Sequence, residues 1–581
     1  MKEGSTIHNV DIARIFDEVA DLLEISGESF FRVRAYRNAS RIIRDLATPL
    51  DRVEKEGTKL ESLPGIGKDL AQKIRTIIET GDLPLRRELE SELPTGLLEV
   101  MKVASLGPRK AHRLYLELGI DNLQKLEEAA RSGKIRELKG FGEKTEVNIL
   151  EGIEAVKGFG KRVLFSEAEI RAEALIDHMR KLRGLKKIEI AGSFRRRKET
   201  VGDLDILVAC ENASAAMDQF VSFPQVAKVI AKGQTKSSVV ISPDLQVDMR
   251  VVDEESFGAA LQYFTGSKAH GITLRTMAQR KGLKLNEYGV FKGSKKIAGK
   301  TEEEVYEALG LPWIPPEMRE NRGEIALALE GQLPKLVELS DIKGDLHMHT
   351  DRTDGRDSLA KMAEEARKRG YLYIAITNHT KRVAMAGGLD EKGLLEEWEE
   401  IRSLNERLPN FHILCGAEVD ILDDGTLDIE DSILANADYV VAAVHYNTNM
   451  PRAKMTRRII KAIGNPYVCA LAHPTGRIIN KRPAYEVSME DIIAAAARYN
   501  VALELNAAPD RLDIDDISCR AAREHGVKVS ISTDAHHSKG LEFIKYGVYQ
   551  ARRGWLEKGD VLNTMTYRTL KKHLKERRDR R

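Results

Sequence analysis

Cysteine is scarce in this chain and its apolar runs are short, which argues against several classes of protein. The 581 residues include four cysteines, far apart and without a CxxC pair, so neither a disulfide framework nor a thiolate zinc site is expected. Apolar stretches such as 439–444 are far shorter than the ~20 residues that cross a bilayer. The first 16 residues lack the apolar segment of a secretion signal. We therefore expect a cytoplasmic protein with no membrane-spanning segment.

Excess charge of either sign is also missing, because 92 Lys and Arg balance 90 Asp and Glu to a net charge of +2. This balance excludes a polybasic tail protein but not nucleic-acid binding, which depends on local patches. At roughly 100–200 residues per domain, the length predicts about three to five domains. Four of the 14 histidines precede residue 342 and ten follow it. Either a metal site in the last third or scattered surface histidines would explain that asymmetry.

Three short segments in the first 150 residues share a tight glycine turn followed by a predicted helix, at 63–74, 104–115 and 138–150. Helical spacing of apolar residues also predicts helices over 9–80. Backbone N–H groups at such turns can hold a DNA phosphate without reading a base, although a single glycine turn is often a mere connector. The predicted DNA-contacting residues of these turns are Gly65, Gly67, Lys68, Gly107, Arg109, Lys110, Gly140 and Gly142.

Three carboxylates in the middle of the chain form the first candidate catalytic site. Asp203 and Asp205 stand two apart at the head of a predicted strand, so both project from one face. Asp248 lies on a second predicted strand that could pair beside the first. Three converging carboxylates need cations, and oxygen ligands suit Mg²⁺ or Mn²⁺, which act on phosphates. The alternative to a catalytic site is an exposed strand with a charged loop that binds no metal.

A small turn upstream of these carboxylates offers donors for a triphosphate. Gly192 and Ser193 are followed by Arg195, Arg196 and Arg197. Backbone N–H, hydroxyl and guanidinium groups together form a set of donors suited to phosphate oxygens.

Nine potential metal ligands gather in the last 240 residues. From 342 onward, about seven strand-like runs alternate with amphipathic helices, which favours a βα barrel. A barrel collects the carboxyl ends of its strands on one face, where the donors would hold three divalent metals, Mn²⁺, Zn²⁺ or Fe²⁺. A strand-end histidine alone is often structural. His347 and His349 are expected on one strand face, and Asp354 in the following turn. The full set is His347, His349, Asp354, His379, Glu418, His445, His473, Asp534 and His536.

The motifs GSFRRR, GDLD, VDMR and YFTGS resemble the palm of the family X DNA polymerases, the group of DNA polymerase beta. The resemblance extends upstream to AYRNA and LPGIGKDLAQKI, and downstream to KLNEYGVF, covering about 9–310. It implies that Asp203 and Asp205 hold two metals and that Asp248 activates the primer 3′-hydroxyl. It also implies that Arg275 touches the template and Arg250 supports the carboxylates. The implied nucleotide contacts are Gly192, Ser193, Arg196, Gly202, Tyr263, Phe264 and Gly266.

The histidine set of residues 342–575 resembles the polymerase-and-histidinol-phosphatase (PHP) domain. This resemblance implies a distorted (β/α)7 barrel that hydrolyses phosphoesters with bound metals. Fused to a family X polymerase, such a domain is expected to provide Mn²⁺-dependent 3′–5′ exonuclease activity, processing of blocked 3′ ends and cleavage at abasic sites.

Together the resemblances imply a multidomain α/β chain that fills short gaps in DNA repair, including base excision repair. The expected partners are gapped or nicked DNA and dNTPs, and a monomer is the default. Two alternatives stay open: a barrel that acts on a small phosphomonoester, and a DNA-end-binding module without catalysis. The expected domains are a helical lyase-like domain (1–85), helix-hairpin-helix fingers (86–158), a nucleotidyltransferase α+β palm (159–262), a small thumb (263–320), a linker (321–341) and the PHP barrel (342–576).

Two departures from the family patterns and one lysine bear on activity. Gly271 stands where an Asn is usual, and losing one hydrogen bond to the base predicts nucleotide selection weaker by ~1–2 kcal/mol. Asn378 replaces an Asp before His379, where it would orient a metal ligand. Lys73 falls at the family's Schiff-base position, so it either attacks the C1′ aldehyde of an abasic sugar or is merely a solvated lysine.

Overall fold

The computed structural model divides the chain into two compact units, residues 1–161 and 162–581. No helix in the described part of the chain is long and apolar enough to cross a membrane. The structure describes residues 9–579 except 45, 47–49, 51–52, 54–58, 64, 95, 102, 104–105, 107, 139, 143–144, 147, 151, 154–161 and 243.

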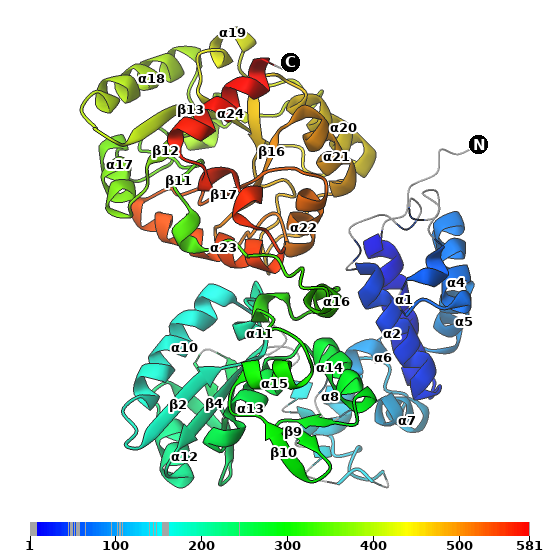
Figure 1. The fold of residues 1–581 in the computed structure, drawn as a ribbon. Helices are drawn as coiled ribbons and strands as arrows, with labels where there is room; N and C mark the ends of the chain where they lie inside the picture. The colour runs from blue at the N-terminus through cyan, green and yellow to red at the C-terminus, as the bar shows by residue number, and fades with distance from the viewer. Residues whose placement is uncertain are drawn as a thin grey trace. The chain divides into compact units, whose positions relative to one another are not determined.

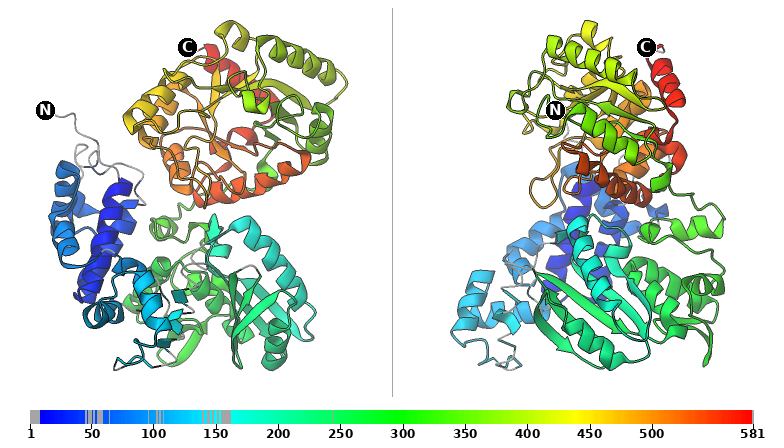
Figure 2. Two further views of the ribbon diagram at one scale, coloured as in Figure 1. Left: turned by 180° about the vertical axis from the view of Figure 1, so that it is seen from behind. Right: turned by 90° about the vertical axis from the view of Figure 1, so that its left-hand side faces the viewer.

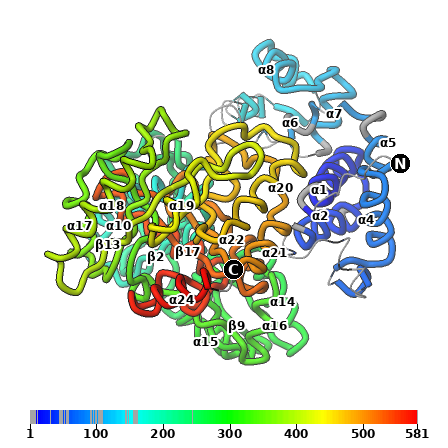
Figure 3. The backbone as a smooth tube through the Cα atoms, turned by 90° about the horizontal axis from the view of Figure 1, so that it is seen from above, coloured from blue at the N-terminus to red at the C-terminus, as the bar shows by residue number. Residues whose placement is uncertain are grey.

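The first unit is helical, as the apolar spacing over 9–80 predicts. Helices α1 (Asn9–Ile25) and α2 (Phe30–Arg44) lie side by side in both views (Figures 1 and 3), and the rings of Phe16 and Tyr36 meet edge to face with centroids 5.5 Å apart. Buried apolar residues such as Phe16 drive this pairing, because they recur at helical spacing and so form one apolar face on the helix. Other helices in the described part of the unit are α4 (Lys68–Thr80), α5 (Pro84–Glu92), α6 (Leu97–Val100), α7 (Pro108–Leu118) and α8 (Leu123–Arg131).

The second unit begins with a five-stranded sheet in the order β2-β4-β7-β6-β5. Period-two alternation on β4 sends Leu204, Ile206 and Val208 into a core with helices α10 (Phe165–Met179) and α12 (Ala213–Val221). Asp203 and Asp205 therefore lie on the opposite face of the sheet, and both project from one face of the strand as predicted. The strands are β2 (Leu185–Ile190), β4 (Asp203–Cys210), β5 (Val226–Lys232), β6 (Lys236–Ile241) and β7 (Leu245–Val251).

Runs rich in β-branched residues predict strands at 187–191, 205–209 and 245–252, and β2, β4 and β7 confirm them. The two strands β5 and β6 have no counterpart in the prediction. Six of the seven residues of β5 are exposed, so it lacks the apolar face that marks a strand in the sequence.

A second, three-stranded sheet follows, where only helices and turns were expected over 263–320. Strands β8 (Lys284–Asn286), β9 (Gly289–Lys292) and β10 (Lys295–Ala298) form it beside helices α13 (Phe257–Thr265) and α14 (Lys268–Arg280). The prediction was wrong here because lysines occupy the exposed positions of these short strands and mask their alternation.

The proline-rich stretch 311–321 is packed into the unit rather than spanning solvent. The Arg319 side chain is fully buried, and its Nη1 lies 2.6 Å from Oε1 of Glu302, at the start of helix α15 (Glu302–Ala308). Its Nε donates to the carbonyl of Ile314 at 2.8 Å. This buried ion pair holds residues 311–321 against the start of helix α15. The short helix α16 (Glu324–Leu329) then opens the expected linker.

The last part of the chain is a nearly closed barrel of seven parallel strands in chain order, each followed by a helix (Figure 1). The first and last strands are joined where His349 N donates to Ala535 O at 2.9 Å and Asp534 N donates to His347 O at 3.0 Å. The expected (β/α)7 barrel is thus confirmed. Its strands are β11 (Gly344–Asp345), β12 (Tyr373–Ile376), β13 (His412–Asp420), β14 (Tyr439–Ala443), β15 (Val468–Leu471), β16 (Ala502–Asn506) and β17 (Val529–Ser532).

Polar caps define where several barrel helices begin. The side chains of Ser358, Asp390, Ser488 and Asp515 each accept a backbone N–H three residues onward, as N-caps do. The helices that cover the barrel are α17 (Leu359–Lys368), α18 (Glu391–Asn405), α19 (Asp431–Leu434), α20 (Arg452–Ile463), α21 (Met489–Tyr499), α22 (Asp516–Glu524), α23 (Ile544–Arg553) and α24 (Tyr567–Asp579).

Two placements in the barrel differ from the prediction. Strand β11 ends at Asp345, so His347 and His349 follow the strand instead of lying on its face. Glu418 lies inside β13, which runs on to Asp420, rather than after a strand end. Both differences come from backbone hydrogen bonding between chain segments, which apolar spacing does not reveal.

Helix α23 joins the barrel to the five-stranded sheet domain within this unit (Figure 2). Lys545 Nζ lies 2.7 Å from Glu169 Oε2, and the Tyr546 hydroxyl donates to the same oxygen at 3.0 Å. The ring of Tyr549 meets Phe165 edge to face, with centroids 5.7 Å apart. Because Tyr546 also belongs to the core of the sheet domain, α23 is shared by both folds.

We predict that Arg319→Met lowers the free energy of unfolding of residues 162–581 by about 3–5 kcal/mol, because it leaves the buried Glu302 carboxylate without one of its charged partners. Urea unfolding followed by tryptophan fluorescence would measure this, since Trp313 lies beside the guanidinium. The exposed Lys284→Met is the control and should change stability by less than about 0.5 kcal/mol. Equal midpoints for the two variants would contradict the prediction.

Candidate active sites

The carboxylates of the five-stranded sheet are brought together by strand register. Strands β4 and β7 run parallel with Asp205 directly opposite Asp248, while Asp203 lies two residues away on the same face. Burial, then the charges of Asp203 and Asp248, raise the pKa of Asp205 to about 6. Like charges crowded in this way would be relieved by a divalent cation.

Asp248 is held in place by polar neighbours. Lys236 Nζ lies 3.1 Å from Asp248 Oδ2, and Gln246 Nε2 donates to Oδ1 at 3.0 Å. Although burial alone would raise its pKa, hydrogen bonds from Gln246, Ser238 and Lys236 lower the pKa of Asp248. The group is therefore ionised at neutral pH and able to accept a proton.

Two glycines let the backbone approach these groups closely. Gly192 has φ +63°, and a Cβ built there would lie 2.7 Å from Asp205 Oδ2. At Gly266, with φ +69°, a Cβ would lie 3.3 Å from Arg196 Nη1. A side chain at either position would displace the carboxylate or the guanidinium.

A basic cavity of about 430 Å³ lies beside this site. Ser193 and Arg196 line it, as expected of triphosphate contacts. Arg196 is positioned by two acceptors, since Nη1 donates to Thr265 O at 2.6 Å and Nε to Glu320 Oε1 at 3.0 Å. Gly202 lies close to another lining residue, because a Cβ there would be 3.2 Å from Arg162 Nη1. Three predicted nucleotide contacts thus line or adjoin one cavity.

The predicted sugar-pocket aromatics form a small stack with the two arginines. Tyr263 and Phe264 meet edge to face at 5.1 Å between centroids. The Arg250 guanidinium lies 4.7 Å from the centre of the Phe264 ring, and that of Arg275 lies 5.6 Å from the Tyr263 ring. A Cβ at Gly271 would lie 3.2 Å from Arg275 Nη1. Arg275 therefore occupies the space beside the glycine that departs from the family pattern.

In the barrel, Glu418 is the centre of one half of the ligand cluster. This carboxylate is 1% exposed, and His473 Nε2 lies 3.0 Å from its Oε1, with His445 Nε2 3.3 Å from the same atom. His379 Nδ1 lies 2.8 Å from Oε2. Burial would raise the pKa of Glu418, but the charges of His379, His445 and His347 hold it well below its usual range.

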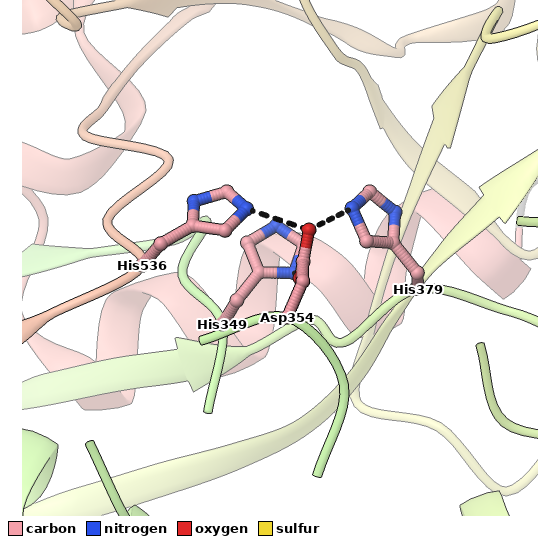
Figure 4. A group of neighbouring side chains, drawn as sticks. All are labelled: His349, Asp354, His379 and His536. Atoms are coloured by element: carbon pink, nitrogen blue, oxygen red, sulfur yellow. Dashed lines mark hydrogen bonds and ion pairs between the residues drawn. The ribbon is translucent and has the colours of Figure 1, made fainter. Parts of the chain in front are cut away.

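Asp354 is the centre of the other half (Figure 4). Its Oδ2 lies between two imidazoles, 3.2 Å from His536 Nε2 and 3.4 Å from His379 Nε2. His349 Nδ1 lies 3.7 Å from Oδ1 of the same carboxylate. Side chains from three separate loops thus point to one spot, since His349 and Asp354 share the loop after β11.

Strained backbone accompanies two of the ligands. His473 has φ +27° and Asp534 has φ +52°, values that cost energy for residues with a Cβ. Such strain is kept where the surrounding structure dictates a side chain's direction, as in binding sites.

The donor set fits divalent metals. His349 Nδ1, His379 Nδ1 and Glu418 Oε2 are buried and make no hydrogen bond of good geometry, although the last two lie 2.8 Å apart. Buried nitrogen and oxygen atoms crowded in this way suit a shared cation. The three sheet carboxylates do not form a comparably tight group among the described residues. Ligand atoms within 4.8 Å of one another come from three groups: His349, Asp354, His379 and His536; His347, His349 and Asp534; and His379, Glu418 and His445.

Three acidic residues that orient these ligands are absent from the prediction. Glu504 Oε2 lies 2.5 Å from His347 Nδ1, and Asp420 Oδ1 lies 3.1 Å from His445 Nδ1. Asp345 accepts from the Thr533 hydroxyl at 2.5 Å. The signal that could have found them is an acidic residue within or at the end of an otherwise apolar strand.

Asn378 also lies behind the ligands, as expected of a residue that orients one. Its Oδ1 accepts the backbone N–H of Thr350 at 2.8 Å, and its Nδ2 donates to the buried Glu397. Burial raises the pKa of Glu397 to about 7. The amide thus fixes the loop that carries His349 and Asp354.

The cluster of histidines and carboxylates opens into a cavity of about 410 Å³. Besides members of the histidine and carboxylate cluster, its lining includes Val383, Met385 and Tyr446. Arg511 also lines it. The site therefore offers an apolar wall and a cation next to its metal ligands.

In the first unit, the structure describes the glycine turn before α4. Gly65 has φ +83° and Gly67 caps the helix that begins at Lys68. In the later turns, Lys110 Nζ lies 5.8 Å from the centre of the Phe141 ring, between Gly140 and Gly142. Gly107 lies outside the described residues, as does the side chain of Arg109.

Lys73 is held as an ammonium ion in this unit. It forms an ion pair with Asp69, and its Nζ lies 5.3 Å from the centre of the Tyr36 ring. Burial alone would lower its pKa, but hydrogen bonds with Asp69 and Tyr36 raise it. A Schiff-base nucleophile must be neutral, so this arrangement works against nucleophilic attack.

Models of five protein families match the chain in an order that parallels these structural parts. A helix-hairpin-helix domain matches residues 7–83, and a SAM-like helix-hairpin-helix tandem matches 97–161. The DNA polymerase beta palm matches 162–275 and the DNA polymerase beta thumb 260–320. The PHP domain matches 345–508.

Characterised proteins resemble either the whole chain or parts of it. The "DNA polymerase/3'-5' exonuclease PolX" of Bacillus subtilis is 38% identical over 573 residues, which are 98% of this chain and 100% of that protein. A "probable phosphatase" of Thermoanaerobacter sp. is 29% identical over 245 residues, 40% of this chain and 95% of that protein. Rat "DNA polymerase lambda" is 23% identical over 351 residues, 55% and 57% of the two chains.

We predict that Glu504→Gln weakens metal binding by about 10–100-fold, because residues that orient a ligating histidine typically contribute that much. Equilibrium dialysis against Mn²⁺ followed by elemental analysis would measure the affinity. Glu524→Gln, at an exposed helix position, is the control and should leave it unchanged. Unaltered Mn²⁺ affinity in Glu504→Gln would show that His347 needs no carboxylate behind it.

Proposed function

Because the chain belongs to the family X DNA polymerases that carry a PHP domain, we propose that it extends primer strands on gapped or nicked DNA and trims their 3′ ends. The observation that carries the proposal is the pairing of Asp205 with Asp248 beside a basic cavity, in the same compact unit as the histidine-rich barrel site. Filling a gap needs a clean 3′-hydroxyl, which the second site would provide. The expected setting is repair of short gaps, including base excision repair.

In the extension reaction, Asp203, Asp205 and Asp248 are the residues that would hold Mg²⁺ or Mn²⁺. Such ions lower the pKa of an attacking hydroxyl and stabilise the leaving pyrophosphate. Asp248, which is kept ionised, would take the proton from the primer 3′-hydroxyl. Ser193, Arg196 and the backbone at Gly192 and Gly202 would bind the triphosphate of the incoming dNTP.

Other residues would select and align the substrates. Tyr263, Phe264 and Gly266 would contact the sugar, and Arg275 would contact the template strand. The glycine turns of the first unit would hold DNA phosphates through backbone N–H groups, supported by Lys68, Arg109 and Lys110.

In the trimming reaction, the nine barrel ligands would hold three divalent ions, Mn²⁺, Zn²⁺ or Fe²⁺. These ions generate a nucleophile at neutral pH and polarise the phosphoester. Glu504, Asp420 and Asp345 keep the ligands oriented, and Arg511 faces the same cavity, where it would attract the phosphate. Cleavage at abasic sites would use this same site.

The proposed domain limits are those expected from the sequence, at residues 85, 158, 262, 320 and 341. A monomeric state and a cytoplasmic location remain predictions. Lyase chemistry at Lys73 also remains a prediction, and it requires that bound DNA disrupt the ion pair with Asp69.

A phosphatase acting on a small phosphomonoester is the second candidate for the barrel, favoured by its similarity to probable phosphatases. The apolar wall of Val383, Met385 and Tyr446 supports a larger substrate with a base or sugar beside the phosphate.

We predict that the two reactions can be removed separately. Asp205→Ala should reduce primer extension on gapped DNA with dNTPs by about 10³-fold or more, the scale on which removing transition-state stabilisation acts. His349→Ala should cause a similar loss of primer shortening, measured with Mn²⁺ and without dNTPs. Gel analysis of a labelled primer follows both reactions.

Each variant serves as the control for the other. Asp205→Ala should shorten primers at the wild-type rate, and His349→Ala should extend them at the wild-type rate. Loss of both activities in either variant would contradict two independent sites.

The choice of substrate for the barrel is tested by competition. Unlabelled primer DNA should inhibit hydrolysis of p-nitrophenyl phosphate at concentrations near its own KM, because both would occupy the cavity lined by Met385 and Tyr446. Met385→Ala should raise the KM for primer shortening several-fold and leave p-nitrophenyl phosphate hydrolysis unchanged. Efficient hydrolysis of the small ester that DNA does not inhibit would favour the phosphatase.

A further inference from the structure

The basic cavity beside the sheet carboxylates is built by two parts of the chain. The sheet domain contributes Ser193, Arg196 and Lys198, whereas the barrel contributes Arg477 and Arg553. Five basic and three acidic residues line the cavity, so it has an excess of two positive charges. The acidic members are Glu199, Asp515 and Asp516.

Arg553, at the end of α23, reaches Arg196 directly. Its Nη1 donates to the backbone carbonyl of Arg196 at 2.7 Å. The same nitrogen lies 3.2 Å from Glu320 Oε1, the oxygen that also accepts from Arg196 Nε. One barrel side chain thus holds both the backbone and, through Glu320, the guanidinium of Arg196.

Arg553 itself has little freedom. Its side chain is 2% exposed, and Nη2 donates to Asp516 Oδ2 at 2.5 Å. Asp516 in turn accepts from Arg322 Nη1 at 2.9 Å. The Glu320 side chain is 11% exposed, and Lys198 Nζ lies 3.5 Å from its Oε1. This alternation of charges makes a rigid support behind the cavity.

We propose that Arg553 is a positioning residue for Arg196, so that the barrel sets how tightly the sheet domain binds a nucleoside triphosphate. The inference rests on the proposed function, in which Arg196 binds the triphosphate. A guanidinium already aligned by two partners loses less freedom when the phosphates bind. Removing Arg553 would leave Glu320 free to pull Arg196 away from the cavity.

The neighbouring residue Arg552 is a matched control. It lies on the same helix and makes a comparable ion pair across the same boundary, with Nε 2.8 Å from Glu317 Oε1. Its Nη1 also donates to the carbonyl of Val337 at 3.1 Å. Any general loosening of the two parts should therefore appear in Arg552→Gln as well.

The test uses the full chain and two readouts. Isothermal titration with dATP and Mg²⁺ gives a Kd, and single-nucleotide primer extension gives KM and kcat. Arg553→Gln should raise the Kd and the KM for dATP about tenfold while kcat stays within about twofold. Primer shortening by the barrel should be unchanged, which shows that the variant is folded. Arg552→Gln should match the wild type in all of these measurements.

A double-mutant cycle tests whether Arg553 acts through Arg196. In the Arg196→Gln background, Arg553→Gln should cause no further rise in the Kd for dATP. Arg553→Lys, which keeps the charge but not the forked donors, should give an intermediate rise and covers the case in which Arg553→Gln fails to fold.

Three outcomes would overturn the inference: equal Kd values for Arg552→Gln and Arg553→Gln, an undiminished effect of Arg553→Gln in the Arg196→Gln background, or a wild-type chain that binds no dATP. Failure of the proposed function looks different, since the wild type would then bind dATP yet extend no primer. In that case the Kd series alone decides whether Arg553 positions Arg196.

Discussion

The barrel depends on one constraint, which is that the buried carboxylate of Glu418 cannot remain without compensating charge. An ionised carboxylate removed from water is very costly unless it is paired or bound to a metal. The partners here come from strands far apart in sequence, and His379, His445 and His473 converge on it only when the barrel is nearly closed. The ligand cluster therefore exists only when the strands of the barrel are in place.

The sheet domain follows the same logic with weaker burial. Asp205 and Asp248 meet because β4 and β7 are parallel neighbours, and parallel pairing places residues of equal register side by side. Lys236 supplies the compensating charge for Asp248. In both sites the strands provide fixed positions, and the chemistry follows from which side chains occupy them.

The parts of the fold that were predictable from sequence are those with strong local signals. Strand β17 (Val529–Ser532) is fully buried, and β-branched Val529 and Ile531 make it one of the seven strand-like runs that the sequence predicts, with the same limits. The exposed strand β5 and the lysine-rich strands β8 and β10 carry no such signal. The seven βα units are regular enough that alternation alone indicated a barrel.

The residues of the candidate sites were also predictable where a local sequence pattern marks them. Apart from Asp354, which lies in a polar turn, each barrel ligand lies in or just after an apolar run, which makes it conspicuous. Glu504 and Asp420 lie in comparable places, but their role is fixed by imidazoles that are distant in sequence. The contact of Arg553 with Arg196 joins residues more than 350 positions apart, and no local pattern records it. Only tertiary structure reveals such partners.

The shared helix α23 has a consequence for how this chain can be divided. Its tyrosines, Tyr546 and Tyr549, are packed against Phe165, and Lys545 is neutralised by Glu169. Cutting the chain between residues 320 and 342 and separating the fragments would expose apolar surface and unpaired charges on both of them. Exposed apolar surface of this kind favours aggregation. The five-stranded sheet domain and the barrel therefore form one structural unit and are not interchangeable modules.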